Sequence, residues 1–133
     1  MILVDSSVWI AYLRGIDAPV VDQLERLIVD DADIAITEPV IMELLAGART
    51  PQELARVEAI ANGLPLVPLR SVTDFRTASD LYRASALNGH PIRSMVDCLI
   101  AAVAIRRDVS LLERDRDFLF LAEISPLRLE SAS

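Results

Sequence analysis

The sequence has no lysine, one cysteine and one histidine, and each shortage excludes a kind of chemistry. All 13 basic residues are arginine, so P-loop phosphate binding and Schiff-base catalysis, which both need a lysine, are excluded. The single Cys98 cannot form an internal disulfide, which suits a reducing compartment. With His90 as the only histidine, a zinc site built from several cysteine and histidine ligands is excluded.

Long apolar runs are also missing. The longest nearly apolar stretch, 95–105, contains Asp97 and is too short to cross a bilayer. The N-terminus has no basic flank and reaches an acid at its fifth residue, so it does not resemble a signal peptide. We therefore expect a cytoplasmic protein without a membrane partner.

Positive charge is scarce relative to negative charge. The chain has 20 acidic and 13 basic residues, for a net charge of -7. Such a protein does not bind a polyanion through a general basic coat. If its substrate is a nucleic acid, a divalent cation is the obvious means of neutralising phosphate locally.

Aliphatic residues are abundant. Hydrophobic residues make up 53% of the 133 residues and aromatic residues only 5%, which predicts one compact domain with an aliphatic core. We expect this domain to span residues 1–130, followed by a polar tail at 131–133.

Hydrophobic periodicity predicts strands that alternate with helices. Short apolar runs predict strands at 1–4, 34–36, 66–69, 109–112 and 127–129. Amphipathic or capped segments predict helices at 7–13, 19–30, 37–47, 51–62, 71–88 and 94–107. Thr37 and Ser94 are expected to cap their helices, and Ser71 with Asp74 has capping-box spacing. The alternation predicts an α/β fold with helices on both faces of a parallel sheet.

Several acids occupy positions where an acid is costly. Asp5 ends an apolar strand, Glu43 and Asp97 are each the only charge in an apolar helical segment, and Asp115 with Asp117 follows another strand. Each has a simple structural alternative: Asp5, Asp97 and Asp115 are suited to helix capping, and Glu43 to a solvent-facing position. Considered singly, the two explanations have about even weight.

Topology favours the functional explanation for the group. The carboxyl ends of parallel strands and the starts of the following helices lie at one edge of a sheet, where ligands bind. Four carboxylates that meet there without a lysine repel one another, and a hard divalent cation such as Mg²⁺ or Mn²⁺ relieves that repulsion. Metal ions in such a site suit phosphodiester hydrolysis, because they activate water and stabilise the leaving oxygen.

These residues resemble those of PIN-domain ribonucleases, in particular the VapC-like toxins of type II toxin–antitoxin modules. The resemblance covers nearly the whole chain. It rests on four segments in order: MILVDSSVWIAYLRG, EPVIMELLAG, RSMVDCLIAAVAI and LLERDRDF.

The resemblance implies a three-layer α/β/α sandwich with a short parallel sheet, and a metal-dependent endoribonuclease. The implied catalytic and metal-binding acids are Asp5, Glu43, Asp97 and Asp115, which would hold one or two Mg²⁺ or Mn²⁺ ions. Asp117 is a further metal ligand that either supplements Asp115 or replaces it as the fourth acid. Ser7 and Ser94 would support the site. Arg93, Arg114 and Arg116 are candidates for contacts with RNA phosphates, although solubility alone explains exposed arginines somewhat better.

The resemblance also implies partners. Such toxins are homodimers that form hetero-oligomers with a cognate VapB-like antitoxin, and the antitoxin silences cleavage of the RNA substrate. His90, between Gly89 and Pro91, is expected in a solvent-facing loop.

Two other functions remain open. A phosphatase of the haloacid-dehalogenase type also uses an Asp after its first strand, but it needs a second acid where Ser7 stands. A catalytically silent PIN-like module that binds RNA or protein would not need the four acids, so their presence argues against it.

Overall fold

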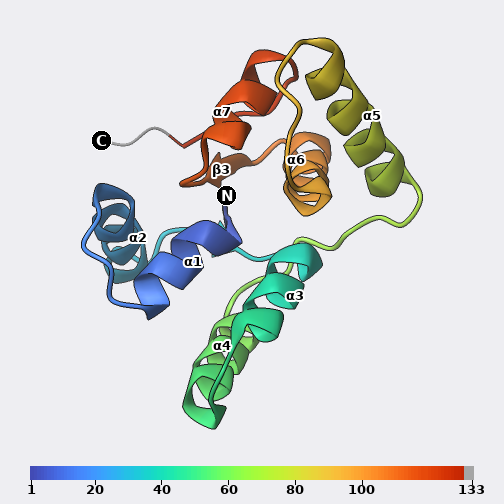
Figure 1. Ribbon diagram of the computed structural model, residues 1–133. Coiled ribbons are helices and arrows are strands. Elements are labelled where there is room, and N and C mark those ends of the chain that lie inside the picture. The colour runs from blue at the N-terminus through green and yellow to red at the C-terminus, as the bar shows by residue number, and fades with distance from the viewer. Residues whose placement is uncertain (131–133) are drawn as a thin grey trace.

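The computed structural model describes residues 1–130 and has a small parallel sheet at its centre (Figure 1). The strand order is β2-β1-β3, in which β1 (Ile2–Val4) pairs with β2 (Ile34–Ala35) and with β3 (Ser110–Leu112). Leu3 of the central strand lies opposite Ala35 on one side and Leu111 on the other. All three are fully buried, which explains why these strands are nearly continuous apolar runs rather than alternating ones.

Seven helices surround the sheet within the described residues. They are α1 (Ser6–Leu13), α2 (Pro19–Val29), α3 (Glu38–Gly47), α4 (Pro51–Gly63), α5 (Thr73–Leu87), α6 (Met95–Arg107) and α7 (Arg116–Glu123). Figure 1 shows α1 and α2 on one side of the sheet and α5 with α6 on the other. The predicted α/β/α architecture is confirmed. Six of the helices match predicted ones, and only α7 was not predicted. None of the described helices is long and apolar enough to cross a membrane.

Helix α6 forms much of the core. Residues 98–104 are buried on every side of this helix, because it lies between α5, α3, α7 and β3. Cys98 is a fully buried free thiol within this segment. Burial all around a helix accounts for the uniformly apolar sequence that follows Asp97.

Two predicted strands are wrong. Segment 66–69 contributes a single parallel bridge, from Leu66 to Ile36, and segment 127–129 contributes another, from Leu129 to Leu111. Each bridge lies at an outer edge of the sheet, where only one residue of the segment pairs with the neighbouring strand. Short apolar runs do not reveal whether a neighbouring strand is long enough to pair with them.

Two predicted caps are also corrected. Ser71 does not cap α5: the N-cap is Val72, with a φ of 67°, and Asp74 instead pairs with Arg106 of α6. Thr37 stands at the N-cap of α3, but its side chain makes no capping hydrogen bond. In both places a tertiary contact or burial outweighs a local preference. The polar tail expected at 131–133 lies outside the described residues.

Candidate metal centre

Asp5 lies where the central strand ends. Its backbone N–H donates to the Leu112 carbonyl at 2.9 Å, which fixes it to the carboxyl end of β3. It is the N-cap of α1, and its Oδ2 accepts hydrogen bonds from the backbone N–H and the hydroxyl of Ser7. The other carboxylate oxygen, Oδ1, is buried and has no hydrogen-bond partner among the described residues. Capping therefore accounts for only one of its two oxygens.

Glu43 reaches the same site from the middle of α3. The Ser6 hydroxyl donates to Glu43 Oε1 at 2.8 Å and joins α1 to α3. Ser6 is only 6% exposed, so this hydrogen bond is well sheltered from water. The solvent-facing alternative for Glu43 is thus wrong, because the side chain is turned towards α1.

Asp97 is the carboxylate shared between two groups of acids. Its N–H donates to the Ser94 hydroxyl at 3.4 Å, so Ser94 caps α6 as predicted. One carboxylate oxygen each from Asp5, Glu43 and Asp97 lie within 4.8 Å of one another. The same is true of Asp97 with Asp115 and Asp117.

The second group of acids is held by the start of α7. Asp115 is the N-cap of this helix, and its Oδ1 accepts from the Asp117 N–H at 3.0 Å. Asp117 is nearly buried, and both of its oxygens have partners. Its Oδ1 lies 3.3 Å from His90 Nε2, and its Oδ2 accepts from the Arg93 N–H at 3.4 Å. The Arg93 guanidinium lies 3.7 Å from Asp117 and 3.9 Å from Asp115.

Burial and the charges of neighbouring acids raise the pKa values of Asp5 and Asp97. Burial is the main cause for Asp5, whose pKa rises to about 6 despite hydrogen bonds from Ser7. Burial raises the pKa of Asp97 to about 7, with further contributions from the negative charges of Asp5, Asp115, Glu43 and Asp117. Negative charge is therefore concentrated where no lysine is available to balance it.

The donor set fits a hard divalent cation. All candidate ligand atoms are carboxylate oxygens, which Mg²⁺ and Mn²⁺ prefer. The unpartnered Oδ1 of Asp5 would be costly in a buried site unless a cation or water occupies the space before it. Because Asp97 belongs to both groups, the geometry suits one ion or two neighbouring ions.

Arginines border the acids on their exposed side. Arg93, Arg114 and Arg116 line one hollow together with Ser7, Asp115 and Asp117. Arg93 is 82% exposed, and its guanidinium is only loosely paired. The three arginines that the sequence suggested for phosphate contacts are therefore next to the acidic cluster.

Three residues at the site were missed by sequence reasoning. Ser6 supports Glu43, yet nothing local distinguishes it from Ser7. Glu113 directly follows β3, and burial together with the charge of Asp5 raises its pKa to about 7; its place after a strand was the available signal. His90 is not a free loop residue, because it contacts Asp117 and stacks on Phe120 at 4.4 Å between ring centroids.

Known proteins share both the sequence and the fold. The family model described as "PIN domain" matches residues 2–124. The chain is 39% identical over 132 residues to the VapC ribonuclease Mb1587 of Mycobacterium bovis and to ribonuclease VapC11 of Mycobacterium tuberculosis, and each alignment covers 98% of both chains. Among solved structures, VapBC2 from Rickettsia felis, bound to a promoter DNA fragment, matches with a TM-score of 0.75 and 21% identity, over 98% of both chains.

Proposed function

The chain belongs to the PIN-domain family, among the VapC ribonucleases, and from this we propose that it is a metal-dependent endoribonuclease acting as the toxin of a type II toxin–antitoxin pair. The observation that carries the proposal is the meeting of Asp5, Glu43, Asp97 and Asp115 at one edge of the sheet. The nuclease domain would comprise residues 1–130. We place the protein in the cytoplasm, because its single cysteine is a free thiol, which suits a reducing compartment, and because its RNA substrate is found there.

We assign the acids to two positions around a shared ligand. Asp5, Glu43 and Asp97 would hold one Mg²⁺ or Mn²⁺ ion, and Asp97 with Asp115 and Asp117 would hold a second. When bound, such ions supply an activated water and stabilise negative charge on the cleaved phosphodiester. The identity of the metal and the use of one or two ions are part of the proposal.

The surrounding side chains orient these ligands. Ser7 fixes one oxygen of Asp5 and leaves the other oxygen buried without a hydrogen-bond partner. Ser6 holds one oxygen of Glu43 and leaves the second available. Ligands that are fixed before the substrate arrives lose little freedom on binding, which is how neighbouring hydrogen bonds tune a metal site.

Asp115 is the better candidate than Asp117 for the fourth main ligand. Both oxygens of Asp117 already have partners in His90 and Arg93. The Asp115 side chain is 32% exposed, whereas that of Asp117 is 8% exposed. We therefore assign Asp117 to the support of the second position.

The partners follow from the same reasoning. Arg93, Arg114 and Arg116 would contact phosphates of the RNA beside the cut bond. The structural relatives include VapBC complexes, which supports control by a VapB-like antitoxin in a hetero-oligomer. We expect the chain itself to form a homodimer.

Cleavage of total RNA by the purified protein tests the proposal. We expect discrete fragments with Mg²⁺ or Mn²⁺, none with EDTA, and none with Asp97→Asn. Asp80→Asn is the matched control, because Asp80 is an exposed acid on α5 that belongs to neither group of acids. If Asp97→Asn cleaves as well as the unchanged protein, the catalytic assignment is wrong. If neither cleaves and both are equally toxic in cells, the chain is a binding module instead.

A further inference from the structure

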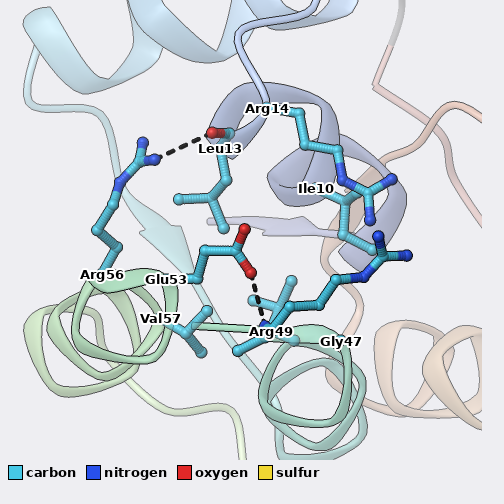
Figure 2. A pocket seen from close by; sticks show the side chains of 10 residues that line it. Ile10, Leu13, Arg14, Gly47, Arg49, Glu53, Arg56 and Val57 are labelled. Carbon is cyan, nitrogen blue, oxygen red and sulfur yellow. Dashed lines mark hydrogen bonds between the residues drawn. The ribbon is translucent and has the colours of Figure 1, made fainter. Parts of the chain in front are cut away.

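A second hollow lies beside the acidic cluster, between α1, α3 and α4. Its volume is about 240 Å³. Its floor is apolar, formed in part by Ile10, Leu44 and Val57, and arginines stand around its rim. Figure 2 shows Arg14 extending from α1 and Arg49 from the segment after α3, with both guanidinium groups on the side of the cavity next to Ile10.

Neither arginine has an acidic partner in the part of the chain that the structure describes. Within residues 1–130, no carboxylate oxygen lies within 4.0 Å of either guanidinium. The nearby Glu53 carboxylate is turned to the backbone N–H of Arg49, at 2.6 Å, and not to its side chain. The third arginine at the rim, Arg56, donates to the Leu13 carbonyl at 3.0 Å (Figure 2).

Two unpaired guanidinium groups on one side of a cavity are notable in a chain with a net charge of -7. They repel each other until an anion binds between them. Arginine presents its N–H donors in a planar fork, and this fork matches the oxygens of a phosphate. The local charge is thus complementary to a phosphate group, although the overall charge of the protein is not.

The hollow shares a lining residue with the hollow at the acidic site. Ile10 lines this cavity and also the hollow that contains Asp115 and Asp117. Ser7 and Ile10 of α1 and its C-cap residue Arg14 follow one another at spacings of three and four residues, so they lie along one side of the helix. At 1.5 Å per residue, Ser7 and Arg14 are separated by about 10 Å along the helix axis. A chain of phosphates leaving the acidic site over Ile10 would reach Arg14 and Arg49 next.

We propose that Arg14 and Arg49 form a phosphate subsite for the RNA strand that flanks the cleaved bond. The subsite rests on the proposed nuclease function, since it extends the path of the same strand. The apolar floor supports the ribose and the face of a base, while the two guanidinium groups bind the phosphate. An acidic protein segment is the competing occupant, but RNA is favoured because Ile10 lines both this cavity and the hollow that contains Asp115 and Asp117.

The test measures RNA binding by the double variant Arg14→Gln/Arg49→Gln. Binding is recorded by fluorescence anisotropy at a series of salt concentrations. Both side chains are exposed, and neither makes a side-chain hydrogen bond or ion pair within the described part of the chain, so the variant should keep its thermal stability. The probe is a fluorescein-labelled single-stranded RNA of about 20 nucleotides, which is long enough to span both hollows. Arg83→Gln, on the exposed face of α5, is the matched control.

We expect the double variant to bind this RNA about tenfold more weakly, and the control to bind normally. The slope of log affinity against log salt should fall in magnitude by about 0.7, because the subsite holds one phosphate and each lost phosphate contact contributes roughly 0.7 for a single strand.

Unchanged affinity and slope in the double variant would overturn the subsite. The subsite would also be overturned if the double variant bound RNA normally but no longer bound a labelled peptide of alternating Leu and Glu. That result would assign the cavity to an acidic protein segment. The proposed catalysis is judged separately. Normal RNA binding without cleavage of total RNA contradicts the nuclease function, whereas cleavage with unchanged binding by the double variant contradicts only the subsite.

Discussion

The Ser6 hydroxyl and the Glu43 carboxylate, 37 residues apart in sequence, form a 2.8 Å hydrogen bond that joins α1 to α3 at the acidic site. This contact determines the direction of Glu43 and therefore the shape of the first proposed metal position. Its importance follows from burial, since Ser6 is 6% exposed and water cannot readily replace its hydroxyl.

Ser6→Ala should therefore weaken metal binding. Without the hydroxyl, Glu43 is no longer oriented towards Asp5 and Asp97, and we expect Mn²⁺ affinity to fall by roughly tenfold. Isothermal titration with Mn²⁺ measures the change. Ser79→Ala is the control, because the Ser79 hydroxyl bonds only to a carbonyl within α5. Equal affinity in Ser6→Ala and the control would show that Glu43 needs no such support.

Without metal, the acidic cluster should make stability depend on pH. The pKa of Asp97 in the folded protein is about 7, against an ordinary value of 3.8. The folded state thus binds this proton more tightly than the unfolded state does, so stability rises as pH falls from about 7 towards 4. Asp97→Asn should raise the melting temperature at pH 8, by roughly 5 °C, and much less near pH 4. Thermal melts in EDTA at both pH values test this, and a variant that is less stable at pH 8 would contradict it.

Added metal should make the unchanged protein melt at a higher temperature than Asp97→Asn, which reverses the order expected without metal. A ligand that binds only the folded state stabilises it by mass action. Millimolar Mn²⁺ should therefore raise the melting temperature of the unchanged protein and of Asp80→Asn, but not that of Asp97→Asn. A similar rise in all three proteins would mean that Mn²⁺ binds outside the cluster.

Replacing Asp115 and replacing Asp117, the two acids at the start of α7, should have different effects on metal binding and cleavage. Asp117 is already bonded to His90 and to the Arg93 N–H, whereas Asp115 is more open. We expect Asp115→Asn to reduce Mn²⁺ affinity and cleavage more than Asp117→Asn does. Titration calorimetry and cleavage assays on the two variants, side by side, decide between them. The opposite order would make Asp117 the primary ligand.

The ion pair between Asp74 and Arg106 should be essential for stability. The Asp74 carboxylate is 1% exposed and takes two hydrogen bonds from the Arg106 guanidinium, at 2.8 and 2.9 Å. Burial opposes ionisation, yet these bonds and the Arg70 N–H hold the pKa of Asp74 below its ordinary value. Arg106→Leu leaves a buried charge unpaired, so urea denaturation should show a loss of about 3–5 kcal/mol.

Arg107→Leu provides the control for that measurement. Arg107 is the exposed neighbour on the same helix turn, and its replacement should change the free energy of unfolding by about 0.5 kcal/mol or less. Similar losses in both variants would attribute the effect to the helix end and not to the ion pair.

Local sequence was sufficient for most of the fold, because burial and helix formation leave periodic signals. The strand ending at Asp5, the helix capped by Ser94 and the uniformly apolar α6 all appear where the patterns predict them. Contacts between remote segments leave no such signal. For that reason Leu66 and Leu129 were expected within strands although each makes a single bridge, and Ser71 was expected to cap a helix that begins after Val72.

The candidate site divides in the same way. The sequence alone determined which acids stand in apolar surroundings and that strand ends and helix starts would bring them to one edge. Only the tertiary structure decided that β1 lies between β2 and β3, so that Asp97 is shared by two groups of acids. It also decided that Ser6 supports Glu43, that His90 contacts Asp117, and that Arg14 and Arg49 border one cavity. The physical reason is that carboxylates and strands are encoded locally, whereas strand order and side-chain partners depend on how distant segments pack.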